Sequence, residues 1–157
     1  LFFVQKRNGL NYHEFDCYKF RSMNLNPKAH IEQVSKNDPR ITRVGRFLRK
    51  TSIDELPQFI NVFLGQMSVV GPRPHMVSHT EMYAQRVNKF MVRHFVKPGI
   101  TGLAQTKGYR GEVEKETDII NRVKYDIFYM ENWSILLDIK IIFMTIFNTI
   151  KGEDKAY

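Results

Sequence analysis

Two adjacent carboxylates, Asp54 and Glu55, are the side chains of this sequence best suited to chemistry. An ionised carboxylate can attack an electrophilic centre, and its oxygens are the ligands that a hard cation such as Mg²⁺ prefers. Most of the surrounding charge is positive, which attracts anions to the pair. On local grounds alone, a helix cap beside a surface charge explains the pair more often, because capping patterns far outnumber active sites.

The stretch around the pair is predicted to begin a helix. Ser52 and Glu55 stand three residues apart, which is the spacing of a capping box. Pro57 suits the first turn if Asp54 is instead the N-cap, and Gly65 is a natural stop. Either start places Asp54 in the field of the helix N-terminus, which favours its ionised form. Apolar residues at helical spacing indicate the helix itself: Leu56, Phe59, Ile60, Phe63 and Leu64.

The composition is that of a globular protein with a strong positive charge. Its 157 residues are 43% hydrophobic and 25% charged, and 24 Lys and Arg outnumber 16 Asp and Glu, for a net charge of +8. This balance predicts an anionic partner, such as nucleic acid, an acidic membrane surface or a phosphorylated small molecule. The single cysteine, Cys17, excludes an internal disulfide and offers no metal-ligand spacing, so the cytosolic side is the expected compartment.

Residues 1–157 are expected to form one domain cut from a longer protein. The sequence begins at Leu1 inside an apolar run, without a charged leader or a small-residue cleavage site. No segment reaches the roughly 18 uninterrupted apolar residues that a membrane-spanning helix needs.

The pattern of the remaining residues predicts a small α+β fold with several amphipathic helices. Residues 1–5 and 15–20 are aromatic and β-branched and flank a loop containing Asn8-Gly9, as in a β-hairpin. Polar residues 24–40 predict a loop with a short helical turn, and residues 105–112 predict a glycine-flanked basic loop. Further helices are predicted at 41–50, 78–95 and 113–130. The inward residues of the last two are predicted to be Met82, Tyr83, Val87, Phe90, Met91, Ile119, Ile120, Val123, Ile127 and Phe128.

The last predicted helix, residues 135–150, is unusual. Ser134 is a plausible N-cap after Trp133, and the second half of the helix is apolar on every side. A helix of this kind lies either in a core or against something apolar outside the protein. The core is favoured for a soluble domain, while Trp133 and the basic charge make a membrane interface a competing location.

Six short motifs occur in the order found in one bacterial enzyme family. They are residues 18–23 (YKFRSM), 38–42 (DPRIT), 49–58 (RKTSIDELPQ), 70–74 (VGPRP), 97–102 (KPGITG) and 109–112 (YRGE). On these motifs the chain resembles the bacterial sugar transferases, the polyprenyl-phosphate hexose-1-phosphate transferases, from residue 1 to about Lys151. Several motifs in order are far more specific than any one of them. The N-terminal membrane segment of that family is expected to precede residue 1.

The resemblance implies a membrane-associated domain and a defined reaction. A hexose-1-phosphate moves from a UDP-sugar, such as UDP-glucose or UDP-galactose, to undecaprenyl phosphate or another polyprenyl phosphate, and UMP leaves. Asp54 would form a covalent aspartyl-phosphosugar intermediate in a ping-pong cycle. The product starts exopolysaccharide, capsule or glycan assembly on the cytoplasmic face of the bacterial inner membrane.

Family positions also assign roles to individual residues. Asp54 and Glu55 match the catalytic dyad and are the expected Mg²⁺ ligands. Because a carboxylate must approach an anionic diphosphate, fixed cations are needed, and those that match are Lys19, Arg49, Arg73 and Arg110. Two prolines hold the backbone on either side of Arg73. Asp126 matches an acidic position of undefined role, for which a structural salt bridge is an equal explanation.

A second function class remains open on the residues alone. The arginine-rich helix at 40–50 is compatible with a basic module that binds nucleic acid or an acidic surface without catalysis. That helix has no partner helix in a helix-turn-helix pattern and no interleaved aromatic residues, so nucleic acid is not the expected partner. A third interpretation is that the isolated piece folds but needs its parent protein for turnover. No motif encodes the sugar or the oligomeric state.

Overall fold

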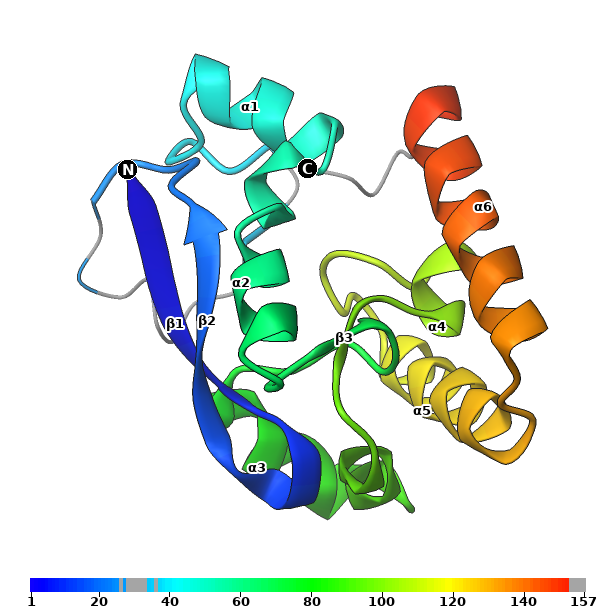
Figure 1. Ribbon diagram of the computed structural model, residues 1–157. Coiled ribbons are helices and arrows are strands. Elements are labelled where there is room, and N and C mark those ends of the chain that lie inside the picture. Colours follow the sequence, from blue (N-terminus) through cyan, green and yellow to red (C-terminus); the bar gives the residue numbers. More distant parts are fainter. Residues whose placement is uncertain (26, 28–33, 36, 153–157) are drawn as a thin grey trace.

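The fold is given by a computed structural model that describes residues 1–25, 27, 34–35 and 37–152. The described residues form two two-stranded sheets with helices around them, which confirms the α+β class (Figure 1). Three 3-10 turns are present: η1 (Leu10–Tyr12), η2 (Ile53–Glu55) and η3 (Phe90–Phe95). The remaining elements are β1 (Phe2–Asn8), β2 (Glu14–Phe20), α1 (Arg43–Lys50), α2 (Gln58–Phe63), β3 (Ser68–Val70), α3 (Val77–Arg86), β4 (Gly99–Thr101), α4 (Leu103–Thr106), α5 (Glu116–Glu131) and α6 (Ile135–Lys151).

The predicted N-terminal hairpin is confirmed, and it is longer than expected. β1 and β2 pair antiparallel from Phe2 opposite Phe20 to Asn8 opposite Glu14. Figure 1 shows the hairpin along one side of the molecule, with α2 between it and the layer made by α4, α5 and α6. The register places Lys19 near the open end of the hairpin, on the strand that packs against α2 and η2.

A short parallel pair, β3 and β4, lies at the centre of the fold and brings two distant motifs together. The backbone N–H of Gly71 donates to the Thr101 carbonyl at 2.9 Å, and the N–H of Gly99 donates to the Pro72 carbonyl at 2.9 Å. The strands are so close here that a Cβ on Gly99 would lie 2.1 Å from the Gly71 nitrogen. The proline-rich segment that carries Arg73 is therefore fixed to the β4 strand.

Three small hydrophobic clusters form the core. One joins α3, η3 and α5, a second joins β3, α4, α5 and α6, and a third lies between β2 and the segment before β3. Their buried members are Tyr83, Val87, Phe90, Ile119 and Val123 in the first, Val70, Leu103, Tyr129 and Ile141 in the second, and Phe15, Cys17 and Met67 in the third.

Several sequence predictions need correction. The helix predicted at 78–95 is interrupted, because α3 ends at Arg86, where the backbone of Val87 becomes extended. After a left-handed Lys89 (φ 60°) the chain continues as the 3-10 turn η3. Met91 and Phe128, predicted to point inward, are exposed. α5 begins at Glu116 rather than at residue 113. Part of the predicted loop at 24–40, residues 26, 28–33 and 36, lies outside the described residues.

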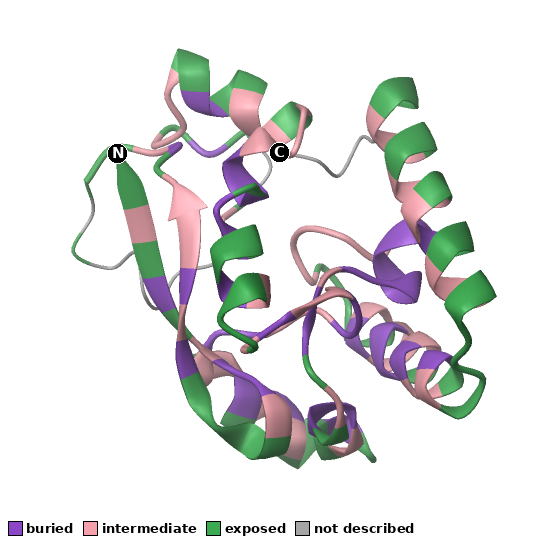
Figure 2. Cartoon of the chain, viewed as in Figure 1, coloured by how far each residue is buried: buried purple, intermediate pink, exposed green. Residues whose placement is uncertain are grey.

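The core location favoured for the last helix is wrong. Ser134 caps α6 as predicted, since its Oγ accepts from the Leu137 N–H at 3.1 Å. Along this fully described helix, Ile141 is the one buried residue. Large apolar side chains such as Phe143 and Phe147 are exposed instead, and Figure 2 shows α6 largely in the colours of exposed and intermediate residues.

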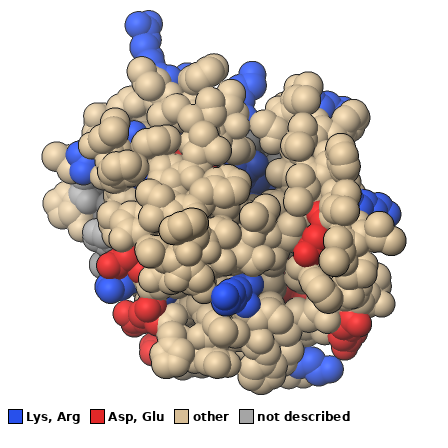
Figure 3. Space-filling view, viewed as in Figure 1, with Lys and Arg blue, Asp and Glu red and all other residues tan. Residues whose placement is uncertain are grey.

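Helix α2 exposes apolar side chains in the same way. Phe63 is 93% exposed, and Leu56, Phe59, Ile60 and Leu64 are also on the surface. The exposed apolar residues on and beside α2 and along α6 are called the apolar face below; they are Leu56, Phe59, Ile60, Phe63, Leu64, Ile135, Leu136, Ile139, Phe143, Ile146, Phe147 and Ile150. Figure 3 shows the side of the molecule that carries these elements as mostly uncharged, with Lys and Arg mainly toward its margins. Among the residues that the structure describes, no helix has the length and apolar character needed to cross a membrane.

The contact between β3 and β4 yields a stability prediction. Gly99→Ala should lower the free energy of unfolding by about 3 kcal/mol or more, because the new methyl group meets backbone atoms that cannot move aside independently. Gly108→Ala is the matched control: it has a left-handed φ of +89° but no atom within 4 Å of its Cβ position. That variant should lose about 1 kcal/mol from backbone strain alone. Urea unfolding of both proteins measures the difference, and equal losses would contradict the packing explanation.

Candidate active site

Asp54 and Glu55 lie in a single 3-10 turn rather than in the first turn of a regular helix. α2 begins only after Pro57, so neither predicted start is correct. Ser52 does not form the predicted capping box, because it adopts a left-handed backbone (φ 59°) and its side chain caps nothing. Its Oγ instead accepts from Arg110 Nη2 at 2.9 Å. The turn is thus tied to the loop that follows α4.

Asn61, on α2, fixes this turn relative to the hairpin. Its side chain is completely buried. The Oδ1 atom accepts from the Tyr18 backbone N–H at 3.1 Å, and Nδ2 donates to the Asp16 carbonyl at 2.7 Å and to Gln66 Oε1 at 2.8 Å. A buried amide with both ends bonded in this way permits one orientation of α2 on β2. This orientation sets the distance between the acidic pair and Lys19.

Glu55 contacts three of the four predicted cations. Lys19 Nζ lies 2.9 Å from Oε1, Arg73 Nη2 lies 2.5 Å from the same oxygen, and Arg110 Nη2 lies 3.8 Å from Oε2. Burial alone would raise the pKa of Glu55, but the charges of Arg73, Lys19 and Arg110 together lower it well below its usual value. Glu55 is therefore ionised in the folded protein and holds cations from three separate segments.

Asp54 has a different environment. It is 6% exposed, and its Oδ1 atom is enclosed without a hydrogen-bond partner among the described residues. Burial raises the pKa of Asp54; Lys19 opposes this shift, while the adjacent Glu55 adds to it. The predicted effect of a helix N-terminus on the pKa of Asp54 is thus outweighed, since α2 starts four residues later, at Gln58, and burial dominates. An enclosed, unbonded carboxylate oxygen is free to bond to a ligand.

Arg49, the fourth predicted cation, faces Asp54 rather than Glu55. It lies on α1, where Nη1 donates to Ser22 Oγ at 3.2 Å and Nε has no partner among the described residues. Burial lowers its pKa, and the charges of Asp54 and Glu55 partly offset that shift. Its side chain lines the same cavity as Asp54.

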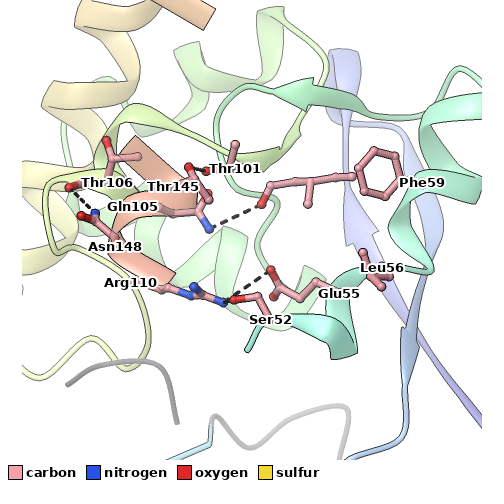
Figure 4. Close-up of a pocket in the computed structure, with 11 residues that line it drawn as sticks. Ser52, Glu55, Leu56, Phe59, Thr101, Gln105, Thr106, Arg110, Thr145 and Asn148 are labelled. Atoms are coloured by element: carbon pink, nitrogen blue, oxygen red, sulfur yellow. Dashed lines mark hydrogen bonds and ion pairs between the residues drawn. The ribbon is translucent and has the colours of Figure 1, made fainter. Parts of the chain in front are cut away.

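Two cavities meet the acidic pair from different sides. The larger, about 410 Å³, is bordered by the hairpin and contains Asp54, Lys19, Arg49 and Arg73 on its wall. The smaller, about 80 Å³, lies between the α2 and α6 regions and includes Glu55 on its wall (Figure 4). Its other lining residues are Ser52, Leu56, Phe59, Ile100, Thr101, Gln105, Thr106, Arg110, Thr145 and Asn148. The pair therefore separates a strongly basic cavity from one that adjoins the apolar face.

Asp126 lines neither cavity and supports Arg73 indirectly. It forms a buried ion pair with Arg93, with Asp126 Oδ2 2.8 Å from Arg93 Nη2. The same nitrogen donates to the Arg73 backbone carbonyl at 2.6 Å. Burial raises the pKa of Asp126 to about 6, against the opposing charges of Arg93 and Arg122. These contacts correspond to the structural salt bridge that was one of the two explanations for this residue.

Three arginines near the site were missed from the sequence: Arg93, Arg7 and Arg122. Arg7 follows Gln5 by two residues, so both point to the same face of β1. Arg122 lies between Ile119 and Val123 on the buried face of α5. A charged residue at an inward position of a strand or helix is the sequence signal that could have identified Arg7 and Arg122.

The side chains of this site are compatible with a magnesium ion held by Asp54 together with a bound phosphate. Both oxygens of Glu55 already face cations, whereas Asp54 Oδ1 is unbonded. In the part of the chain that the structure describes, no three His, Cys, Asp or Glu side chains converge as a metal cage. Mg²⁺ is commonly held by one or two carboxylates, substrate phosphates and water. Asp54 with a bound phosphate meets that requirement, and Glu55 would first have to release a cation.

Comparison with known proteins gives consistent results. A family model described as "Bacterial sugar transferase" matches residues 1–152. A UDP-glucose:undecaprenyl-phosphate glucose-1-phosphate transferase of Klebsiella pneumoniae is 53% identical over 146 residues, which are 92% of this chain and 31% of that protein. The protein of the same name from Escherichia coli K12 is 52% identical, over 92% of this chain and 32% of its own length.

A relative with a different sugar in its name is also similar. The UDP-N-acetylgalactosamine-undecaprenyl-phosphate N-acetylgalactosaminephosphotransferase of Aeromonas hydrophila is 41% identical over 96% of this chain and 35% of its own length. The chain thus spans about a third of the length of these curated relatives. The family match at residues 1–152 spans the acidic pair and its cations.

The Arg93–Asp126 pair yields a prediction. Arg93→Leu should lower the free energy of unfolding by about 3–5 kcal/mol, because it leaves the Asp126 carboxylate buried without its partner. Arg93→Leu combined with Asp126→Leu should recover part of this loss, since the unpaired charge is then gone. Urea denaturation of the wild type, both single variants and the double variant measures the coupling. Strict additivity of the two single effects would contradict the pairing.

Proposed function

The chain belongs to the bacterial sugar transferase family, and on this premise we propose that it transfers a sugar-1-phosphate from a UDP-sugar to a polyprenyl phosphate. One observation carries the proposal: Asp54, whose Oδ1 atom is enclosed without a hydrogen-bond partner among the described residues, lines a cavity rich in cations. An acidic nucleophile surrounded by arginine and lysine suits an anionic, phosphorylated substrate. The names of the relatives include glucose and N-acetylgalactosamine, so similarity at this level selects no single sugar.

The first half of the reaction uses Asp54 as the nucleophile. A carboxylate oxygen bonds to the sugar-bearing phosphorus while the bond from that phosphorus to the bridging oxygen breaks. The electron pair of the broken bond stays on the bridging oxygen, which leaves as part of UMP. This half-reaction gives an aspartyl-phosphosugar intermediate.

The cations allow this attack of an anion on an anion. Arg49 and Lys19 lie where they reduce the repulsion between Asp54 and the diphosphate, and Arg73 presents a planar guanidinium to phosphate oxygens. Glu55 acts mainly by holding Lys19 and Arg73 in place through the ion pairs described above. Its role is positioning, because its own oxygens are already occupied.

Mg²⁺ is part of the proposal, with Asp54 and the substrate phosphates as the groups that would hold it. When bound, such an ion neutralises charge on the phosphate oxygens and polarises the phosphorus toward attack. Glu55 remains a candidate second ligand.

The second half of the reaction regenerates Asp54. An oxygen of the polyprenyl phosphate bonds to the same phosphorus, and the bond to the Asp54 carboxylate breaks. The smaller cavity offers a route for the lipid, because Leu56 and Phe59 line it beside Arg110. The lipid-linked sugar would then start the assembly of an exopolysaccharide, a capsule or another glycan.

We extend the proposal to the membrane. A lipid-linked acceptor requires the domain to lie at a bilayer surface, and the apolar face supplies exposed aromatic and aliphatic side chains on two helices. Exposed basic residues of α1, Arg43 and Arg46, are suited to anionic headgroups. The expected location is the cytoplasmic face of the bacterial inner membrane.

A basic module that binds nucleic acid without catalysis is not favoured. The buried acidic pair, with its enclosed and unbonded Asp54 oxygen, would have no role in such a module. The similarity to named transferases favours the enzyme as well.

Asp54 provides the central test. Asp54→Asn should reduce sugar-phosphate transfer by more than about a thousandfold, because the amide cannot form the covalent intermediate. Membranes containing the protein, a radiolabelled UDP-sugar panel, a polyprenyl phosphate and Mg²⁺ measure the rate. Mass spectrometry after an acid quench should find a sugar-phosphate adduct on the peptide that contains Asp54. Transfer by the variant at nearly the wild-type rate would exclude Asp54 as the nucleophile.

Phe63 tests the membrane surface. Phe63→Glu should weaken binding to anionic vesicles at least about tenfold, since it removes a large apolar group and places a charge at the interface. Stability should be unchanged because the side chain is 93% exposed. The matched control is Phe95→Glu, which changes an exposed phenylalanine of η3, a segment that packs on α3 and α5. Equal weakening by both variants would show that the effect is general charge repulsion.

A further inference from the structure

Two arginines that the proposed reaction leaves without a role lie on the wall of the larger cavity. Arg7 comes from β1 and Arg122 from α5, and the cavity also contains Asp54 and Arg73. Arg122 is buried, with 6% of its surface exposed. Residues from elements so far apart in the sequence reach one cavity only because the fold brings the hairpin and α5 to its two sides.

Both guanidinium groups are anchored by neutral oxygens. Arg7 Nη1 donates to the Pro74 carbonyl at 3.1 Å, and Nη2 donates to Gln5 Oε1 at 2.6 Å. Arg122 Nη2 donates to the Gly111 carbonyl at 2.7 Å. Among the described residues, the Nε–H groups of both arginines have no acceptor, and neither arginine forms an ion pair with Asp or Glu. Each side chain is therefore oriented, and its charge is not neutralised by a contacting carboxylate.

This situation differs from that of the neighbouring cations. Lys19, Arg73 and Arg110 share the carboxylate of Glu55, and Arg93 is paired with Asp126. Burial lowers the pKa of Arg7 to about 10, and burial followed by the charge of Arg73 lowers that of Arg122 to about 10. Both groups stay charged at neutral pH. A buried cation without a carboxylate partner is unfavourable unless an anion can occupy the space beside it.

A histidine beside the two arginines adds no charge to balance them. His75 lies against the same cluster, and burial, followed by the charges of Arg93, Arg122, Arg7 and Arg73, lowers its pKa well below the usual value. It is neutral at physiological pH and has an enclosed Nε2 atom without a partner in the described structure. Asp54 on the same wall and Asp126, which is paired with Arg93, form no ion pair with either arginine among the described residues, so a bound ligand is the anion that fits beside them.

Building on the transfer reaction proposed above, we propose that Arg7 and Arg122 bind the phosphate that remains with the departing nucleotide. A diphosphate sugar presents two phosphates, and Asp54 with its nearby cations accounts for the sugar-bearing one. The second phosphate gains negative charge as the bridging bond breaks, and the UMP that results carries between one and two charges near neutral pH. This second phosphate therefore needs further cations, whose charge is not already neutralised by a carboxylate of the protein.

The backbone supports the division between the two phosphates. Arg7 is bonded to the carbonyl of Pro74, the residue directly after Arg73. The cation for one phosphate is thus adjacent in the fold to the cation for the next, as the two phosphorus centres of a diphosphate require. A planar guanidinium with free N–H groups forms paired hydrogen bonds to phosphate oxygens.

Calorimetric titration of the 157-residue chain with UMP tests the proposal. Arg7→Gln and Arg122→Gln should each raise the dissociation constant for UMP at least about tenfold, because each removes charge-assisted hydrogen bonds to phosphate. Uridine, which lacks the phosphate, should bind the wild type and the variants equally weakly. Arg86→Gln is the matched control, since it removes one exposed arginine from α3 and should leave UMP binding within twofold.

Each outcome has a defined meaning. Circular dichroism checks folding, and Arg122→Lys, which keeps the charge but loses the planar fork, should bind UMP with intermediate affinity. Undetectable binding of UMP by the wild type, or unchanged binding by both Gln variants, would overturn the assignment. Parallel titration with geranyl phosphate decides the source of the phosphate: a larger effect of the two arginines on geranyl phosphate than on UMP would also overturn it. Failure of the proposed transfer reaction would be a distinct result, in which the wild type binds UMP but transfers no sugar phosphate.

Discussion

A single buried carboxylate, that of Glu55, holds the site together. Its two oxygens face cations from β2, from the segment after β3 and from the loop after α4, which are otherwise independent parts of the fold. Three positive charges cannot share one small volume without a negative charge among them. Asn61 fixes the location of that carboxylate relative to the hairpin, so a neutral amide and a charged acid together determine where Lys19, Arg73 and Arg110 lie.

The two carboxylates of the pair consequently have different tasks. Glu55 is ionised and bonded to its neighbours, whereas Asp54 lines the larger cavity and has one enclosed oxygen without a hydrogen-bond partner among the described residues. Position in a 3-10 turn makes this division geometrically simple, because consecutive residues of so tight a turn point in different directions. The acidic pair can then contact the basic cavity through Asp54 and the smaller cavity beside the apolar face through Glu55.

Local pattern predicted much of the fold, and long-range contact decided the remainder. The hairpin, the helix at 41–50 and the Ser134 cap were predicted because periodicity and capping depend on neighbours in the sequence. The start of α2 was not predicted, because the Ser52 hydroxyl accepts a hydrogen bond from Arg110, 58 residues away, instead of capping the helix. The pKa of Asp54 is raised by burial under distant segments, which local sequence does not reveal. The proposed role of Arg7 and Arg122 likewise depends on the fold, which places both residues on the wall of one cavity.

The construction of α6 has a calorimetric consequence. It is attached to the rest of the fold through the buried Ile141 and through polar contacts: Thr145 bonds to Thr101, Asn148 donates to the Thr106 carbonyl, and Asp138 accepts from Tyr129. Most of its apolar side chains are already in contact with water in the isolated folded chain, so unfolding hydrates little additional hydrocarbon there. The heat capacity increment per residue should consequently fall below the roughly 12–15 cal/mol/K of ordinary globular proteins, which gives a flatter stability curve.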